Sequence, residues 1–164
     1  MKKGFTLVEA LVSIGLVSLI ITAIFSVLSI ADLSWQTDTN LLELQQHVRM
    51  TMDSIAKEVR NSVPGTIYSS VPEYLTFYVY VKNPLDPYEY VQSPTPIMYT
   101  FDKAAKEIKR YNYGTTRVLA KDISNLSFSL SGEMLEIRIN ASKIVKGKVI
   151  SYSMLDKVRL RNEE

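Results

Sequence analysis

The apolar positions near the amino terminus form one long uncharged block. From residue 10 to residue 31 there are 22 consecutive residues without a charge, and polarity rises sharply at Asp32. As a helix this block would measure roughly 33 Å, which is enough to cross a hydrocarbon core of about 30 Å. We therefore expect a membrane-spanning helix at this end of the chain.

The next stretch of the chain has a helical pattern of a different kind. Between residues 41 and 59 apolar side chains recur at spacings of three and four, which places them on one helix face. Pro64-Gly65 then stops the helix. Because such a stripe usually packs on a domain, we expect this half of the helix to bury it against a sheet. The stripe consists of Leu41, Leu44, Val48, Met52, Ile55 and Val59.

From Gly65 onward the sequence predicts strands and turns. Tyrosine, valine, isoleucine and threonine are frequent here, and these residues favour strands. Short turns at Ser131-Gly132 and near Lys146-Gly147 imply an antiparallel meander. We expect strands at 74–81, 97–101, 107–113, 117–120, 123–130, 134–141 and 149–160, and a loop at 83–96.

Together these patterns predict an α+β fold, with a long N-terminal helix packed on a C-terminal antiparallel β-sheet. The chain contains no cysteine, so it has no disulfide framework and no cysteine-based metal site. With 164 residues it is long enough for one domain and an anchor. A domain held outside the cytoplasm would then be stabilised by packing alone.

Three interpretations compete for the amino-terminal block. A secretory signal peptide would use Lys2 and Lys3 as its basic region, but the apolar run is longer than the roughly 7–15 residues expected. A plain signal anchor, with the two lysines inside, explains the length and the topology. It does not explain why a carboxylate, Glu9, stands at the start of the apolar stretch, where an unpaired charge is costly.

The third interpretation accounts for that carboxylate. The segment Gly4-Phe5-Thr6-Leu7-Val8-Glu9, after two lysines and before an uncharged run, resembles the cleavage and methylation motif of type IV prepilins. The resemblance implies that a prepilin peptidase cuts between Gly4 and Phe5, and that the new amine of Phe5 is N-methylated. The resemblance further implies that the apolar helix is retained and that Glu9 pairs with the Phe5 amine of a neighbouring subunit during assembly. The alternative for Glu9 is a topological marker at the headgroup level.

The resemblance also implies a division of the chain. Residues 1–4 would be the leader peptide, and residues 5–31 the transmembrane and filament-core helix. Residues 32–62 would be the exterior amphipathic half of that helix. Residues 63–164 would form a pilin-like β-rich head packed on residues 32–62.

Later segments resemble a narrower group. The ending Lys157-Val158-Arg159-Leu160-Arg161-Asn162 is similar to the VxLRN segment that closes many minor pilins and pseudopilins of the J-type in type II secretion and the W-type in type IV pili. Their long helix tends to carry a pattern like that of Arg49, Asp53, Glu58 and Arg60, and the stretch 99–110 is similar to their tyrosine-rich hairpin. The alternative for Arg159 and Arg161 is solvent-facing charge.

Enzymatic chemistry has little support in the sequence. There is no phosphate-binding glycine loop and no nucleophilic set, and the single histidine, His47, is expected to be a solvated helix residue. The carboxylate pairs Asp102 with Glu107 and Asp86 with Glu89 lack the spacing of a calcium loop. We expect no enzyme, no cofactor and no metal. The net charge of +2 argues against direct nucleic acid binding.

The expected function is structural: a minor pilin or pseudopilin subunit of a type IV pilus or a type II secretion-like filament, acting in assembly or priming. Expected partners are prepilin peptidase, other pilin subunits, the membrane and the inner-membrane assembly platform. The chain would cross the inner membrane once, with its head outside the cytoplasm. Alternatives are a competence pseudopilin for DNA uptake and a membrane-anchored binding or sensor domain.

Overall fold

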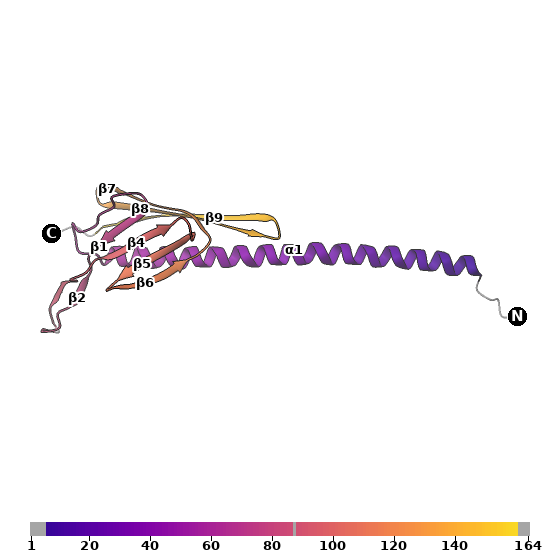
Figure 1. Ribbon diagram of the computed structural model, residues 1–164, viewed down its shortest axis with the longest axis horizontal. Helices are drawn as coiled ribbons and strands as arrows, with labels where there is room; N and C mark the ends of the chain where they lie inside the picture. Colours follow the sequence, from indigo (N-terminus) through magenta and orange to yellow (C-terminus); the bar gives the residue numbers. More distant parts are fainter. Residues whose placement is uncertain (1–5, 87, 161–164) are drawn as a thin grey trace. The chain divides into compact units, whose positions relative to one another are not determined.

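The computed structural model describes residues 6–86 and 88–160. Within these residues there is one α-helix, α1 (Leu7–Arg60), followed by nine β-strands (Figure 1). The chain falls into two compact units, Met1–Thr39 and Asn40–Glu164, and α1 contributes residues to both.

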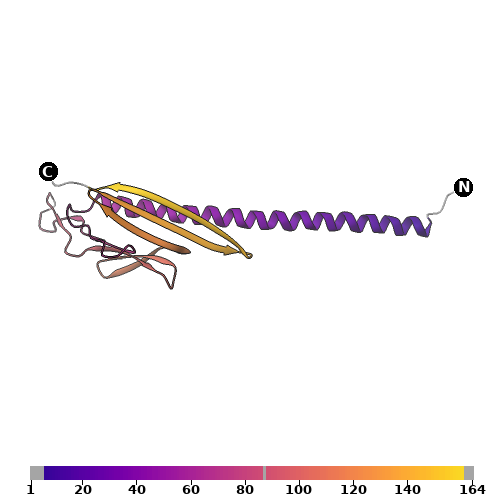
Figure 2. The ribbon, with the colours of Figure 1, turned by 90° about the horizontal axis from the view of Figure 1, so that it is seen from above.

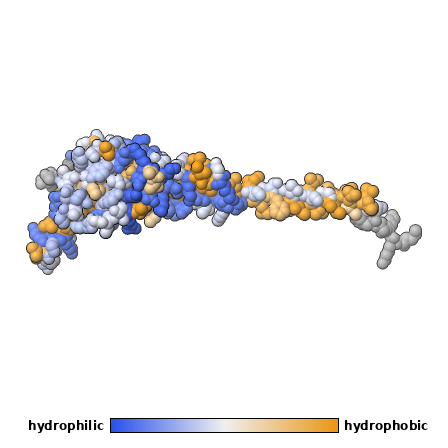
Figure 3. Space-filling view, in the orientation of Figure 1, coloured by the Kyte–Doolittle hydropathy of each residue, from blue (hydrophilic) through white to orange (hydrophobic). Residues whose placement is uncertain are grey.

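The described part of the first unit is almost entirely α1, and its apolar side chains are exposed. Every residue from 6 to 35 is exposed, and the apolar surface of this segment is plain in Figure 3. By length and composition α1 can cross a membrane. Its hydroxyl groups suit that environment, because Ser13, Ser18, Thr22, Ser26 and Ser29 each donate to the carbonyl four residues earlier, at 2.7–2.9 Å.

In the second unit α1 buries the predicted stripe. Leu44 is 3% exposed, and Val48, Met52, Ile55 and Val59 are fully buried, whereas Leu41 is half-buried. The helix ends at Arg60, and Gly65 follows with a φ of 71°. The prediction of an amphipathic helix that packs on the head is confirmed.

The strands form three antiparallel groups. A four-stranded sheet has the order β1-β4-β5-β6, a two-stranded ribbon pairs β2 with β3, and a three-stranded sheet has the order β7-β8-β9. The long strands β8 and β9 are clear in Figure 2. The strands are β1 (Tyr74–Phe77), β2 (Tyr80–Lys82), β3 (Tyr90–Gln92), β4 (Ile97–Asp102), β5 (Glu107–Asn112), β6 (Thr115–Ala120), β7 (Ile123–Ser131), β8 (Met134–Val145) and β9 (Lys148–Arg159).

One hydrophobic core joins the helix stripe to both larger sheets. Alternate residues of β8 enter it, so Leu135, Ile137, Ile139 and Ala141 are buried while their neighbours are exposed or half-buried. Phe77 of β1 stacks on Tyr99 of β4, with ring centroids 6.1 Å apart. The expected α+β class, with the helix packed on antiparallel sheets, is confirmed.

Two details of the expected strand pattern are wrong. The single strand expected at 74–81 is two strands in different sheets, because Tyr78 and Val79 turn to the end of the helix: Val63 donates to the Tyr78 carbonyl at 2.7 Å and Ser62 bridges Val79. The expected loop at 83–96 contains a strand, β3, which pairs with β2 just before the loop. Tyr90–Gln92 lies between the prolines and needs no proline nitrogen for this pairing.

Candidate functional site at the amino end of the helix

The described chain begins with a reciprocal helix cap. The backbone N–H of Thr6 donates to Oε2 of Glu9 at 2.9 Å, and the Thr6 hydroxyl donates to the same oxygen at 2.9 Å. The backbone N–H of Glu9 lies 3.3 Å from the Thr6 hydroxyl oxygen. This is a capping box, in which the first residue before the helix and the third residue within it satisfy one another's backbone donors.

The cap explains why a carboxylate is stable at this end of an apolar helix. Glu9 lies in the first turn of α1, where the exposed N–H groups favour a negative charge. A cap of this kind stabilises the start of a helix. Both bonds from Thr6 end on Oε2, so Oε1 of Glu9 accepts no hydrogen bond from any residue the structure describes.

The two predicted processing residues, Gly4 and Phe5, lie outside the described residues. They directly precede Thr6 in the sequence. The cap involves Thr6 as well as Glu9, and the spacing Thr-x-x-Glu before an apolar run is a recognised signal for a helix start.

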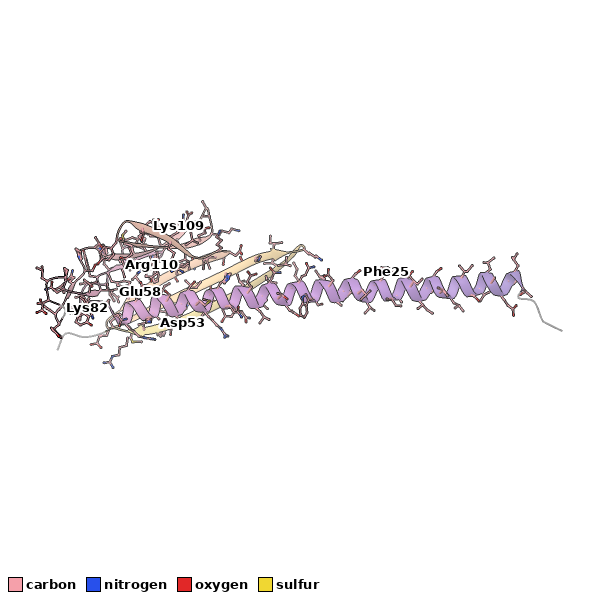
Figure 4. All side chains as sticks on the ribbon, turned by 90° about the horizontal axis from the view of Figure 1, so that it is seen from below. Phe25, Asp53, Glu58, Lys82, Lys109 and Arg110 are labelled. Atoms are coloured by element: carbon pink, nitrogen blue, oxygen red, sulfur yellow. The ribbon has the colours of Figure 1, made fainter. Side chains whose placement is uncertain are left out.

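A second polar cluster links α1 to the four-stranded sheet. The Glu58 carboxylate accepts a hydrogen bond from the Tyr99 hydroxyl at 2.6 Å and from Nε of Arg110 at 3.0 Å. A terminal nitrogen of Arg110 lies 3.0 Å from the other oxygen of Glu58. Figure 4 shows Glu58 on the helix and Arg110 on the adjacent strand. The resemblance had marked Glu58 and the stretch 99–110 separately, and the structure brings them together.

Burial and the Glu58 carboxylate together determine the protonation of this cluster. Burial of the Tyr99 ring, together with its hydrogen bond to Glu58, holds the pKa of that hydroxyl well above its ordinary value. Burial opposes the charge of Arg110, but the hydrogen bonds and the charge of Glu58 outweigh it, so the pKa of the guanidinium rises. Tyr99 stays a neutral donor and Arg110 stays charged, which is the state that a structural clasp requires.

The carboxylate pairs considered as acid–base or calcium groups have structural partners. Asp102 accepts from Lys109 at 2.6 Å and caps the backbone of the β4–β5 turn, and Lys109 also lies 4.0 Å from Glu107. Asp86 accepts from the backbone of Tyr88, and Glu89 accepts from Asn83. No group of three potential metal ligands occurs within residues 6–86 and 88–160.

His47 lies on the solvent-exposed side of α1, as expected, beside a half-open cleft of about 360 Å³. Lys143 and Glu43 border the same cleft, with Lys143 Nζ 3.7 Å from Glu43. The cleft combines one imidazole with paired charges, and nothing in it resembles an activated nucleophile.

The carboxyl-terminal segment is divided between core and surface. Val158 is fully buried and Leu160 packs against the core. Arg159 is exposed and lies 3.4 Å from Glu133, as expected for a solvent-facing charge. Arg161 and Asn162 lie outside the described residues.

Comparison with known protein families identifies a known motif in the amino-terminal segment. Residues 1–30 match the family described as the prokaryotic N-terminal methylation motif. No curated protein and no solved structure matches the chain. The match gives no evidence for the J-type or the W-type of subunit. The chain therefore carries a type IV pilin-type prepilin signal on an α+β protein whose helix is long and apolar enough to cross a membrane.

Proposed function

We propose that the chain is a structural, non-enzymatic pilin-like subunit that prepilin peptidase processes between Gly4 and Phe5 and that then joins a filament as a minor component. The observation that carries the proposal is the methylation motif over residues 1–30, followed directly by the exposed apolar segment of α1. A signal peptide would be discarded with its apolar region, whereas here the apolar segment is continuous with the helix that forms the core of the head.

In the membrane the apolar segment anchors the chain, and in a filament it packs against equivalent helices. Residues 5–31 serve both as the membrane anchor and as the filament-core helix. Residues 32–62 form the second half of the helix, which packs on the head formed by residues 63–164. The head lies outside the cytoplasm, because Lys2 and Lys3 remain on the inner side.

Assembly is proposed to use Glu9 as a bridge between subunits. Oε2 of Glu9 remains on Thr6 of its own chain, and Oε1 accepts the Phe5 amine of the neighbouring subunit. This arrangement satisfies the carboxylate by a hydrogen bond within the chain and by an opposite charge between chains. A carboxylate with a partner on each oxygen can then leave the headgroup region for the apolar core of a filament.

The bridge is tested by substitutions at Glu9. The full-length chain is co-expressed with prepilin peptidase and the other subunits, and its fraction in sheared or co-purified filaments is measured. Glu9→Val is expected to insert in the membrane normally and to be nearly absent from filaments. Glu9→Gln keeps a side-chain oxygen that can cap Thr6 but lacks the charge, so it is also expected to be lost from filaments.

Normal incorporation of Glu9→Val would contradict the bridge. Thr6→Val is the matched control, because it removes the hydroxyl while leaving the carboxylate, and we expect it to retain most incorporation. Gly4→Val, which blocks the cut, separates this function from a membrane-anchored binding or sensor domain. Full function with the leader retained would favour the latter.

A further inference from the structure

The hairpin tip between β8 and β9 presents an apolar pair that does not belong to the core. Ile144 and Val149 face each other across the two strands and are 71% and 65% exposed. Their neighbours Val145 and Ile150 are 8% and 5% exposed. Because successive side chains of a strand point to opposite faces, Ile144 and Val149 lie on the outer face. Val145 and Ile150 lie on the core face, where they are paired across the strands with Lys148 and Lys143.

The same tip is basic. Lys143, Lys146 and Lys148 stand within six residues, and no acidic residue occurs from position 141 to position 155. Apolar side chains flanked by lysines are typical of surfaces that enter the boundary between lipid headgroups and acyl chains.

The turn gives the tip a defined shape. Lys146 and Gly147 form a two-residue connection, and both have positive φ, 47° and 83°. A turn of this kind matches the right-handed twist of the flanking strands. The apolar pair is therefore held on a paired ribbon that extends beyond the other strands of its unit (Figure 1).

The tip also lies at the end of its unit where the chain enters. Lys143, at the base of the tip, is 3.7 Å from Glu43, close to the first residue of the Asn40–Glu164 unit. Only the eight residues 32–39 separate that unit from the end of the apolar run at residue 31. Eight residues span at most about 29 Å even when fully extended.

We propose that the β8–β9 tip docks on the anionic phospholipid surface of the membrane that holds the apolar run, before the subunit leaves that membrane. Ile144 and Val149 enter the interfacial region, and the exposed Lys148 beside the turn meets a lipid phosphate. The short tether makes this contact intramolecular, so a weak surface affinity is sufficient. The proposal depends on the membrane anchor and does not depend on filament assembly.

The absence of cysteine allows a clean test with single labels in the full-length chain. Ile144→Cys carries an environment-sensitive fluorophore, and the protein is reconstituted in nanodiscs containing phosphatidylglycerol or only phosphatidylcholine. In anionic nanodiscs we expect a blue shift and quenching by lipids that carry a nitroxide near the headgroup. Lys148→Gln in the same labelled chain is expected to lower the ratio of docked to undocked tip about fivefold.

Two reference labels make a negative result informative. A label at Ser18→Cys, within the apolar run, must be quenched by deep nitroxides, which shows that the anchor is inserted. A label at Ser131→Cys, at the end of β7 and paired with the first residue of β8, should remain exposed to water. The proposal is overturned if the label at position 144 behaves like the one at 131, or if its quenching is independent of lipid charge. A blue shift that grows with protein density without lipid quenching would also overturn it, in favour of a second copy of the chain.

Discussion

Glu58 and Arg110 are 52 positions apart in the sequence, yet two nitrogens of the Arg110 guanidinium each lie 3.0 Å from a Glu58 carboxylate oxygen. This two-point contact fixes both the distance and the rotation of α1 against β5. The Tyr99 hydroxyl of β4 completes the site at 2.6 Å, so one helix carboxylate holds two adjacent strands.

Replacement of Glu58 is expected to destabilise the head more than replacement of a typical partly exposed residue. Glu58→Ala leaves the buried Tyr99 hydroxyl without its acceptor and the half-buried Arg110 without its counter-charge, at a cost of about 2–3 kcal/mol. Tyr99→Phe removes one hydrogen bond and should cost about 1 kcal/mol. Denaturant unfolding in mild detergent, followed by circular dichroism of the β-sheet signal, measures both.

Asp53→Ala is the control for this pair, because Asp53 is exposed on the same helix one and a half turns away. We expect its effect to remain within about 0.5 kcal/mol. Equal losses for Asp53→Ala and Glu58→Ala would show that helix propensity, and not the clasp, accounts for the effect.

The helix stripe supports a second prediction. Ile55 is fully buried, so Ile55→Ala should lower the free energy of unfolding by about 2–5 kcal/mol through lost burial and a residual cavity. Met50, on the same helix, is 70% exposed, and Met50→Ala should change stability by less than about 0.5 kcal/mol. Similar midpoints for the two variants would contradict the packing of α1 on the sheets.

Asp102 should contribute to the acid sensitivity of the head. The hydrogen bond from Lys109, with those from the Ala105 and Ala104 backbone, holds the pKa of Asp102 below its ordinary value of about 4. A carboxyl with a lowered folded pKa stabilises the folded state above the unfolded pKa, and this contribution is lost as the pH falls through the folded pKa. Melting temperatures between pH 6 and pH 3 should fall less steeply for Asp102→Asn than for the parent chain. Parallel curves would contradict this assignment.

Local patterns in the sequence were sufficient to predict much of the fold. The spacing of Leu44, Val48, Met52, Ile55 and Val59 specifies a helix face directly, and Ser131-Gly132 and Lys146-Gly147 mark tight turns between strands. The break after Phe77 was not predictable, because residues 74–81 are uniformly rich in strand-forming side chains. What divides them is a backbone contact with Ser62 and Val63 at the helix end.

The candidate site shows the same division between local and long-range information. The Thr6–Glu9 cap joins residues three positions apart, so the spacing Thr-x-x-Glu is sufficient to predict it from the sequence. The contact of Glu58 with Tyr99 and Arg110 depends on strand register and helix rotation. No single segment of the sequence encodes either property. The sequence therefore points to Glu58 and to the stretch 99–110 separately, but it does not predict their contact.

The most direct test of the proposed processing is the mass of the amino terminus. The full-length chain is co-expressed with an active prepilin peptidase or an inactive one, and its N-terminal peptide is analysed by mass spectrometry. The account predicts a chain that begins at Phe5, carries one N-methyl group and retains the apolar run, and this form should disappear with the inactive peptidase or with Gly4→Val. A chain that keeps residues 1–4 beside the active enzyme, or one cut beyond residue 31, would contradict it.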